Sequence, residues 1–180
     1  MKKYIALLRG INVSGQKKIK MTELKSLFEK MDFQNVGTYI QSGNIIFSSK
    51  EISAKSLESK ISLGIKKKFG FDVQTIIITP KEINDVLKNN PFIRQKKNIE
   101  RLYVTFLSDQ PSKESIQKLN LNDFSPEEYH IVGNQIYLHL PNGAGKAKLN
   151  NNFFENKLNI KASTRNWKTV KTLSELANSQ

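Results

Sequence analysis

The segment Thr38–Ser48, TYIQSGNIIFS, constrains the fold most, because two apolar runs flank Ser42-Gly43. Apolar runs joined by a short pair that contains glycine are typical of a β-hairpin with a two-residue turn. If Gln41 pairs with Asn44, one face is mainly apolar and contains Thr38, Ile40, Ile45 and Phe47. The other face then carries Tyr39, Gln41, Asn44 and Ile46. A purely structural hairpin does not need these amide and phenol groups, so the sequence predicts a site near Gln41–Asn44.

Length and composition indicate an ordered protein with one sizeable core or two small ones, since the chain has 180 residues of which 38% are hydrophobic. No stretch approaches the roughly 20 apolar residues of a membrane span. The N-terminal apolar run Tyr4–Leu8 ends at Arg9, and no signal-peptide cleavage site follows it. The absence of cysteine excludes disulfides and thiol nucleophiles. We therefore expect a cytoplasmic protein without a membrane partner.

The net charge of +13 favours polyanionic partners such as RNA, DNA or an acidic membrane surface. The alternative is compositional drift, because 25 of the 29 basic residues are lysine and asparagine and isoleucine are also abundant. The excess of basic residues is spread over both halves of the chain. Charge alone therefore leaves both explanations open.

Residue patterns in the first 80 residues predict the order strand–helix–strand–strand–helix–strand. One helix covers Met21–Met31, and Ser53 and Gly70 mark the ends of the next. The strands are Lys3–Leu8, the two hairpin strands and Asp72–Thr79. This order is that of a ferredoxin-like α+β sandwich. In that topology the first strand ends beside the hairpin turn, so we expect Arg9–Asn12 to lie next to Gln41–Asn44.

Residues 81–180 repeat this plan without obvious sequence similarity. The predicted elements are a connecting helix over Lys81–Asn89, a strand over Arg101–Leu107, a helix from Ser112 to about Leu119, a hairpin around Gly133-Asn134, a helix from about Lys148 to Leu158, and a last helix with Trp167, Val170, Leu173 and Leu176 on one stripe. We therefore predict an α+β protein of two ferredoxin-like (βαββαβ-type) halves with antiparallel sheets. The predicted domains are residues 1–80 and residues 81–180, the second with the C-terminal helix.

Two features of the second half have both a functional and a structural explanation. The glycines of Gly143–Lys146 suit a phosphate loop, but Ala147 replaces the hydroxyl residue that would hold magnesium, and a flexible strand-to-helix turn is the alternative. His130 and His139 fall on one face of the second hairpin with Glu128 opposite His139, and two imidazoles are too few for a zinc site. The sequence contains no Ser-His-Asp or paired-carboxylate pattern. We expect neither a metal site nor a cofactor.

Arg9 and Arg165 stand out among the four arginines. Both lie in segments rich in Gly, Asn or Thr at element ends, where a bidentate anion contact is easily formed. A structural explanation is the alternative for the second segment, because Thr164 or Asn166 can cap the last helix and Trp167 can belong to the core. The residues do not choose between these explanations.

Three polar motifs carry a resemblance to a known family: LLRGINV at Leu7–Val13, TYIQSGN at Thr38–Asn44, and TRNW at Thr164–Trp167 followed by Thr169-Val170. In order and spacing they resemble the signature of the bacterial family called domain of unknown function 1697, over essentially the whole chain. The resemblance implies a duplicated ferredoxin-like fold and supplies no established activity. The corresponding motif residues are Arg9, Gly10, Asn12, Gly15, Tyr39, Ser42, Gly43, Asn44, Thr164, Arg165, Asn166 and Trp167.

The chain departs from the family pattern at two positions. The family's Gly-x-Gly-x-Ser-Lys loop corresponds to Gly143–Lys148, where Ala147 replaces the serine, and Ser14 stands where a glycine is common. The lost hydroxyl weakens the case for metal or hydroxyl chemistry at this loop, whereas Lys148 remains an anion contact.

Three hypotheses follow. The first is binding of a phosphate-bearing ligand, a nucleotide or nucleic acid, through Arg9, Asn12, Tyr39, Gln41, Ser42, Asn44, Lys148, Thr164, Arg165 and Asn166. The second is an enzyme that acts on a small anionic metabolite, with an arginine as clamp and Tyr39 as acid, although no general base stands out. The third is purely architectural, with the polar motifs as caps and turns. The sequence leaves the oligomeric state open.

Overall fold

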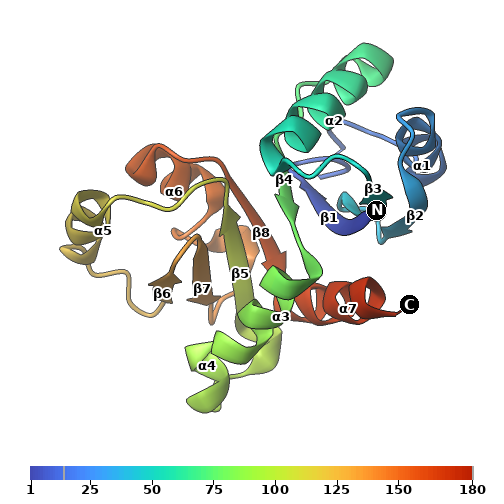
Figure 1. Cartoon of the computed structure of the whole chain (residues 1–180). Coiled ribbons are helices and arrows are strands. Elements are labelled where there is room, and N and C mark those ends of the chain that lie inside the picture. Colours follow the sequence, from blue (N-terminus) through green and yellow to red (C-terminus); the bar gives the residue numbers. More distant parts are fainter. Residues whose placement is uncertain (14, 180) are drawn as a thin grey trace. The chain divides into compact units, whose positions relative to one another are not determined.

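The structure is a computed structural model that describes residues 1–13 and 15–179 (Figure 1). Ser14, noted above for its place in the family pattern, and Gln180 lie outside these residues. Contacts within the chain separate two compact units, one of residues 1–84 with the C-terminal residues from Leu173, the other of Asp85–Thr172. The domain boundary at residue 80 stays a prediction.

The first unit is a ferredoxin-like fold. Its elements follow the predicted order: β1 (Lys2–Leu8), α1 (Met21–Lys30), β2 (Gln34–Tyr39), β3 (Asn44–Ser49), α2 (Ala54–Phe69) and β4 (Thr75–Ile78). The strands form one antiparallel sheet in the order β2-β3-β1-β4. The central strand β3 and the edge strand β4 are buried along their whole length, and β1 is buried from Tyr4 to Leu8.

The core of the first unit lies between one face of the sheet and the helices α1 and α2. Alternate residues of β1, such as Tyr4, Ala6 and Leu8, join this core with the apolar stripes of both helices. The ends of α2 are those expected, since Ser53 Oγ accepts a hydrogen bond from Ser56 N and Gly70 adopts the left-handed conformation with φ 78°. Figure 1 shows both helices labelled beside the strands that they cover.

The turn between β2 and β3 differs from the prediction. Tyr39 pairs with Asn44, so the turn has the four residues 40–43, and the predicted pairing of Gln41 with Asn44 is wrong. The shift is by two residues and therefore leaves each strand residue on its predicted face. The physical reason lies in Gly43, because an ideal Cβ there would be only 2.7 Å from Leu8 Cβ. Gly43 is thus the last residue of the four-residue turn, where it packs closely against β1, and not a central residue of a two-residue turn.

The second unit repeats the ferredoxin-like order. Its strands and the helices between them are β5 (Leu102–Leu107), α5 (Lys113–Asn120), β6 (Glu128–Val132), β7 (Gln135–His139), α6 (Asn151–Leu158) and β8 (Ala162–Asn166). The antiparallel sheet has the order β6-β7-β5-β8. The pairing of Val132 with Gln135 confirms the hairpin around Gly133-Asn134. The remaining helices are α3 (Pro80–Asn89), α4 (Pro91–Arg94) and α7 (Trp167–Asn178), with short 3-10 turns at Ile99–Arg101 and Ala144–Lys146.

Both faces of the second sheet are covered within its unit. Leu119 of α5 and Phe154 of α6 pack against one face. On the opposite face, the buried Tyr137 donates a hydrogen bond to Val86 O at 3.2 Å. This burial raises the pKa of Tyr137 to about 12, with Asp85 as a second cause. Across the described residues, no helix is long and apolar enough to cross a membrane.

Candidate functional site

Three loops of the first unit meet at one edge of its sheet, as the topology predicts. They are the β1–α1 loop (9–20), the β2–β3 turn (40–43) and the α2–β4 loop (70–74), and together they are called the three-loop edge. Leu8 N donates to Gly43 O at 2.8 Å, and Arg9 N donates to Gln74 O at 2.9 Å. The expected proximity of Arg9–Asn12 to the hairpin turn is therefore confirmed.

Arg9 is the first residue of this edge and is partly buried. Its Nη1 donates to Gln74 Oε1 at 3.1 Å, which links the β1–α1 loop to the α2–β4 loop through side chains as well as backbone. A guanidinium has five donors in a planar fork, and the hydrogen bond to Gln74 orients that fork. Arg9 is thereby a positive charge held in place at the edge.

The amide side chains of the edge hold the loops together. Asn12 Nδ2 donates to Ile19 O and to Gln41 O, both at 2.9 Å, and Asn12 Oδ1 accepts from Ile19 N at 2.8 Å. Next to the turn, Asn44 at the start of β3 is fully buried, and its Nδ2 donates to Tyr39 O at 3.1 Å and to Ser42 Oγ at 3.0 Å. All six predicted binding residues of the first unit thus lie at or beside this edge, and its two asparagines build it.

The three-loop edge carries a local excess of positive charge. The three loops contain four basic residues, Arg9, Lys17, Lys18 and Lys20, and one acidic residue, Asp72. The carboxylate of Asp72 pairs with Lys66 Nζ at 2.9 Å, while its carbonyl oxygen accepts from Lys17 Nζ at 2.6 Å. The carboxylate of Asp72 thus pairs with a lysine that lies outside the three loops. With all five charged residues counted, the three-loop edge has a net charge of +3.

Two large hydrophobic residues are exposed at the same edge, Val13 with 53% and Ile40 with 49% of their surface accessible. Ile40 also has a φ of 49°. A β-branched residue in this left-handed region is a genuine outlier, at a cost of about 1–3 kcal/mol. Gly10 has a φ of 70° and open space where a Cβ would be, so the backbone there is accessible to a ligand.

The predicted binding residues of the second unit do not form one face. Thr164 and Arg165 are successive residues of β8 and lie on opposite faces of the sheet. Thr164 Oγ1 donates to Asn151 Oδ1 and contacts Thr105 Oγ1, both at 2.7 Å. Asn166 Oδ1 accepts from Thr169 N at 2.8 Å, so Asn166 caps α7. Trp167 is buried, and the cap and core roles proposed for Asn166 and Trp167 are confirmed.

Arg165 is a buried cation with only 8% of its surface accessible. Its Nη1 donates to Ser163 Oγ and to Thr164 O, both at 2.9 Å. Burial lowers its pKa to about 10, because the charged form loses hydration. The segment 163–166, for which the sequence pattern predicts no element of its own, is part of the edge strand β8 paired with β5.

The loop Gly143–Lys148 already holds an anionic side chain. Glu127 accepts Lys148 N through Oε1 and Leu149 N through Oε2, both at 2.9 Å. A phosphate at this loop would need such backbone donors, which the carboxylate occupies. The side chain of Lys148 is exposed. The structural explanation of this loop, as a strand-to-helix connection, agrees with these contacts.

His130 and His139 share one face of the second hairpin, as predicted. His139 Nδ1 lies 2.8 Å from Glu128 Oε1, and Lys97 Nζ lies 2.7 Å from the same oxygen. Both imidazoles contact the buried ring of Phe92, at centroid distances of 5.1 and 5.9 Å. The Lys97 bond is the main cause of the lowered pKa of Glu128. In residues 1–13 and 15–179, no group of three or more His, Asp and Glu side chains is arranged to hold a metal.

Sequence reasoning missed several residues of the three-loop edge. Gln74, the partner of Arg9, gave no signal because it lies 65 residues away. Lys18 and Lys20 lie in a short basic run that by itself indicates only a solvated turn, although their position after Arg9-Gly-Ile-Asn is a usable signal. The predicted two-residue turn places Ile40 on the mainly apolar face of a strand, whereas the four-residue turn of the structure contains Ile40 and exposes it.

The comparisons with known proteins agree with this fold. A family model described as "Protein of unknown function (DUF1697)" matches residues 1–137, which include the first two motifs but not the third at Thr164–Trp167. Among solved structures, the chain is similar to the conserved bacterial protein SP0830 from Streptococcus pneumoniae, with a TM-score of 0.76 and 21% identity over 98% of each chain. At this identity the likeness shows the fold alone. A search of curated proteins finds no match. The chain therefore belongs to the DUF1697 family.

Proposed function

We propose that this protein binds a phosphate-bearing ligand, a nucleotide or nucleic acid, at the three-loop edge. The observation that carries the proposal is the local charge of +3 on three loops that hydrogen bonds hold together. Arginine and lysine are the side chains that bind phosphate, arginine as a planar fork and lysine as a point charge. Arg9 supplies the oriented fork, and Lys18 and Lys20 supply exposed charges nearby.

The proposal depends on the charged side chains and not on every motif residue. Asn12, Asn44 and Asn166 make hydrogen bonds that explain them as structural residues. Arg165 is left out of the proposed contact set because it is buried. The third hypothesis, architecture, therefore accounts for these asparagines, whereas it gives no reason for the excess of positive charge at the three-loop edge.

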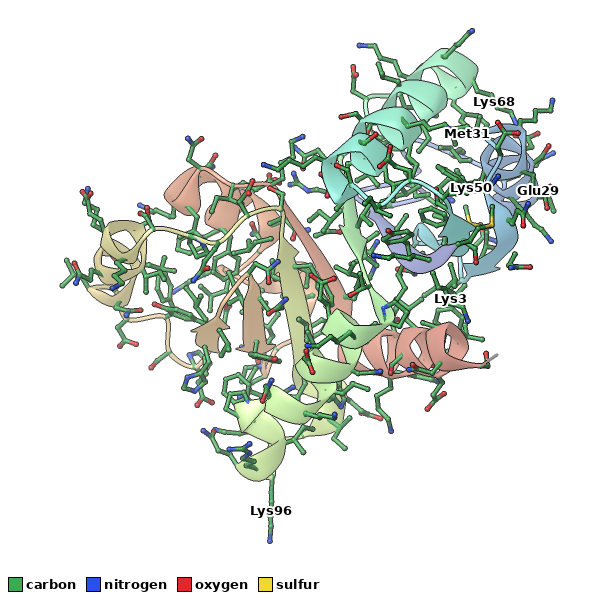
Figure 2. All side chains as sticks on the ribbon, in the orientation of Figure 1. Lys3, Glu29, Met31, Lys50, Lys68 and Lys96 are labelled. Carbon is green, nitrogen blue, oxygen red and sulfur yellow. The ribbon has the colours of Figure 1, made fainter. Side chains whose placement is uncertain are left out.

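The test compares two variants that each remove two positive charges. Lys18→Gln/Lys20→Gln changes the three-loop edge, and Lys30→Gln/Lys50→Gln changes exposed lysines at the end of α1 and after β3 (Lys50 is labelled in Figure 2). The probe is a labelled decamer of abasic deoxyribose phosphates, which carries phosphates without bases. Its affinity is measured by fluorescence anisotropy across a salt series.

We expect the edge variant to reduce the slope of log affinity against log salt by about 1.4, because two phosphate contacts are lost and each contributes about 0.7 on a single strand. The control variant should leave this slope nearly unchanged. Equal losses in both variants would mean a diffuse lysine surface, to which side chains such as the projecting Lys96 contribute equally (Figure 2). That result, or no binding by the unmodified protein, would refute the proposal.

A further inference from the structure

Ile40 combines two unusual properties at the three-loop edge. Its φ of 49° lies in a region that β-branched residues rarely adopt, and 49% of its surface is exposed. Backbone strain of this kind clusters at functional sites. A hydrophobic side chain also gains no stability from exposure to water. The turn thus presents an apolar group in a way that folding alone does not favour.

Val13 presents a second apolar side chain at this edge, with 53% of its surface exposed. Val13 follows Asn12 and Ile40 precedes Gln41, and Asn12 Nδ2 donates to Gln41 O at 2.9 Å. The two apolar residues therefore flank one hydrogen bond that joins the β1–α1 loop to the β2–β3 turn. Gln16 and Gln41, both exposed, bring amide side chains to the same two segments.

We propose that the three-loop edge binds single-stranded nucleic acid, with a base against Ile40 and Val13 and its neighbouring phosphates on Arg9, Lys18 and Lys20. This inference rests on the proposed function and names its ligand. A bare phosphate chain has no group that contacts an alkyl side chain, whereas an unpaired base has an apolar face and a hydrogen-bonding edge. The exposed amides of Gln16 and Gln41 supply donors and acceptors for that edge.

An anionic membrane is the other surface that combines negative charge with apolar contact, and the neighbours of Ile40 disfavour it. Insertion of Val13 and Ile40 into lipid would bring the amides of Gln16 and Gln41 toward hydrocarbon, where their hydrogen bonds to water are lost. Against a base the same amides keep hydrogen-bond partners. The polar surroundings of the two alkyl groups therefore favour nucleic acid.

The test measures the affinity of two labelled probes of equal length and charge, oligothymidylate of ten nucleotides and the abasic decamer. The variant is Ile40→Asn, since asparagine tolerates positive φ and removes the apolar group. The matched control is Ile52→Asn, at an exposed residue that precedes α2. Val13→Asn serves as the second variant if Ile40→Asn does not fold, as judged by circular dichroism.

We expect the unmodified protein to bind oligothymidylate about tenfold more tightly than the abasic decamer, because a base removes apolar surface of Ile40 and Val13 from water. Ile40→Asn should abolish this preference without weakening binding of the abasic decamer, and Ile52→Asn should retain it. Equal affinity of the unmodified protein for both probes would overturn the inference and leave the proposed function intact. No binding of either probe would overturn both. Binding to vesicles of three parts phosphatidylcholine and one part phosphatidylserine, lost in Ile40→Asn, would overturn the inference in favour of a membrane.

Discussion

Replacement of Gly43 with alanine should destabilise the first unit through two separable effects. Gly43 has a φ of 76°, and a Cβ built there would lie 2.7 Å from Leu8 Cβ and 2.9 Å from Ile11 Cδ1. Gly10 has a similar φ of 70° with nothing within 4 Å of such a Cβ, so Gly10→Ala carries the backbone effect alone. The two variants form a matched pair.

The magnitudes follow from general values. Alanine in the left-handed region costs about 1–2 kcal/mol, and the reduced freedom of the unfolded chain offsets about 0.4–1 kcal/mol of it. Gly10→Ala should therefore lower the free energy of unfolding by about 1 kcal/mol. Overpacking adds about 1–3 kcal/mol at Gly43, because Leu8 and Ile11 are fully buried and their backbones are held. Gly43→Ala should thus cost about 2–4 kcal/mol in total.

The assay is urea unfolding followed by far-ultraviolet circular dichroism, together with hydrogen exchange of the Leu8 amide. That amide donates to Gly43 O at 2.8 Å, so its exchange should accelerate in Gly43→Ala far more than in Gly10→Ala. Equal destabilisation by the two variants would refute the reasoning, since it would show that the close approach of Gly43 to β1 has no energetic consequence.

Three further predictions concern the second unit. Asn166→Ala should lower the free energy of unfolding by about 1 kcal/mol in the same urea assay, because the cap of α7 is lost. Asn166→Asp should retain most of the stability of the unmodified protein, because its carboxylate can still cap α7. The pKa of Glu128 is lowered mainly by the hydrogen bond from Lys97, so the stability that Glu128 contributes is present above its ordinary pKa and is lost as the pH falls through the lowered pKa. The difference in unfolding free energy between the unmodified protein and Glu128→Gln should therefore shrink from pH 7 to acidic pH. A difference that stays constant with pH would contradict this prediction. Tyr137→Phe should cost about 1 kcal/mol by thermal unfolding, since Val86 O loses a buried donor, and an unchanged melting temperature would contradict it.

The order of elements was predictable because the relevant signals are local. Ser53 and Gly70 end α2 as a side-chain cap and a left-handed residue, and both act within one helical turn. Gly133-Asn134 closes its hairpin as a two-residue turn for the same reason. The fold class follows from that order, since few topologies fit it.

The predictions from sequence were wrong or incomplete in segments whose local structure is decided by tertiary contacts. Ser42-Gly43 has the composition of a two-residue turn, but Gly43 is required by its approach to Leu8, and the turn lengthens to four residues. The polar sequence of residues 162–166 gives no strand signal by itself. It forms β8 because it pairs with β5, where Thr164 lies opposite Thr105.

The candidate site was predictable in its position but not in the roles of its residues. Topology alone places Arg9 and Asn12 beside the hairpin turn. The partners of Asn12 are backbone atoms of Ile19 and Gln41, which no sequence pattern identifies. An exposed asparagine that binds ligand and one that ties loops together look identical in the sequence, and only their contacts distinguish them.

The most direct test of the central claim is a two-dimensional amide NMR titration of the full chain with the abasic decamer. If phosphate binds at the three-loop edge, the largest shifts will occur at backbone amides of Gly10, Asn12, Gln41 and Gln74, which belong to the three loops. Shifts of similar size around lysines of both units would contradict the claim, and so would shifts concentrated in the loop Gly143–Lys148.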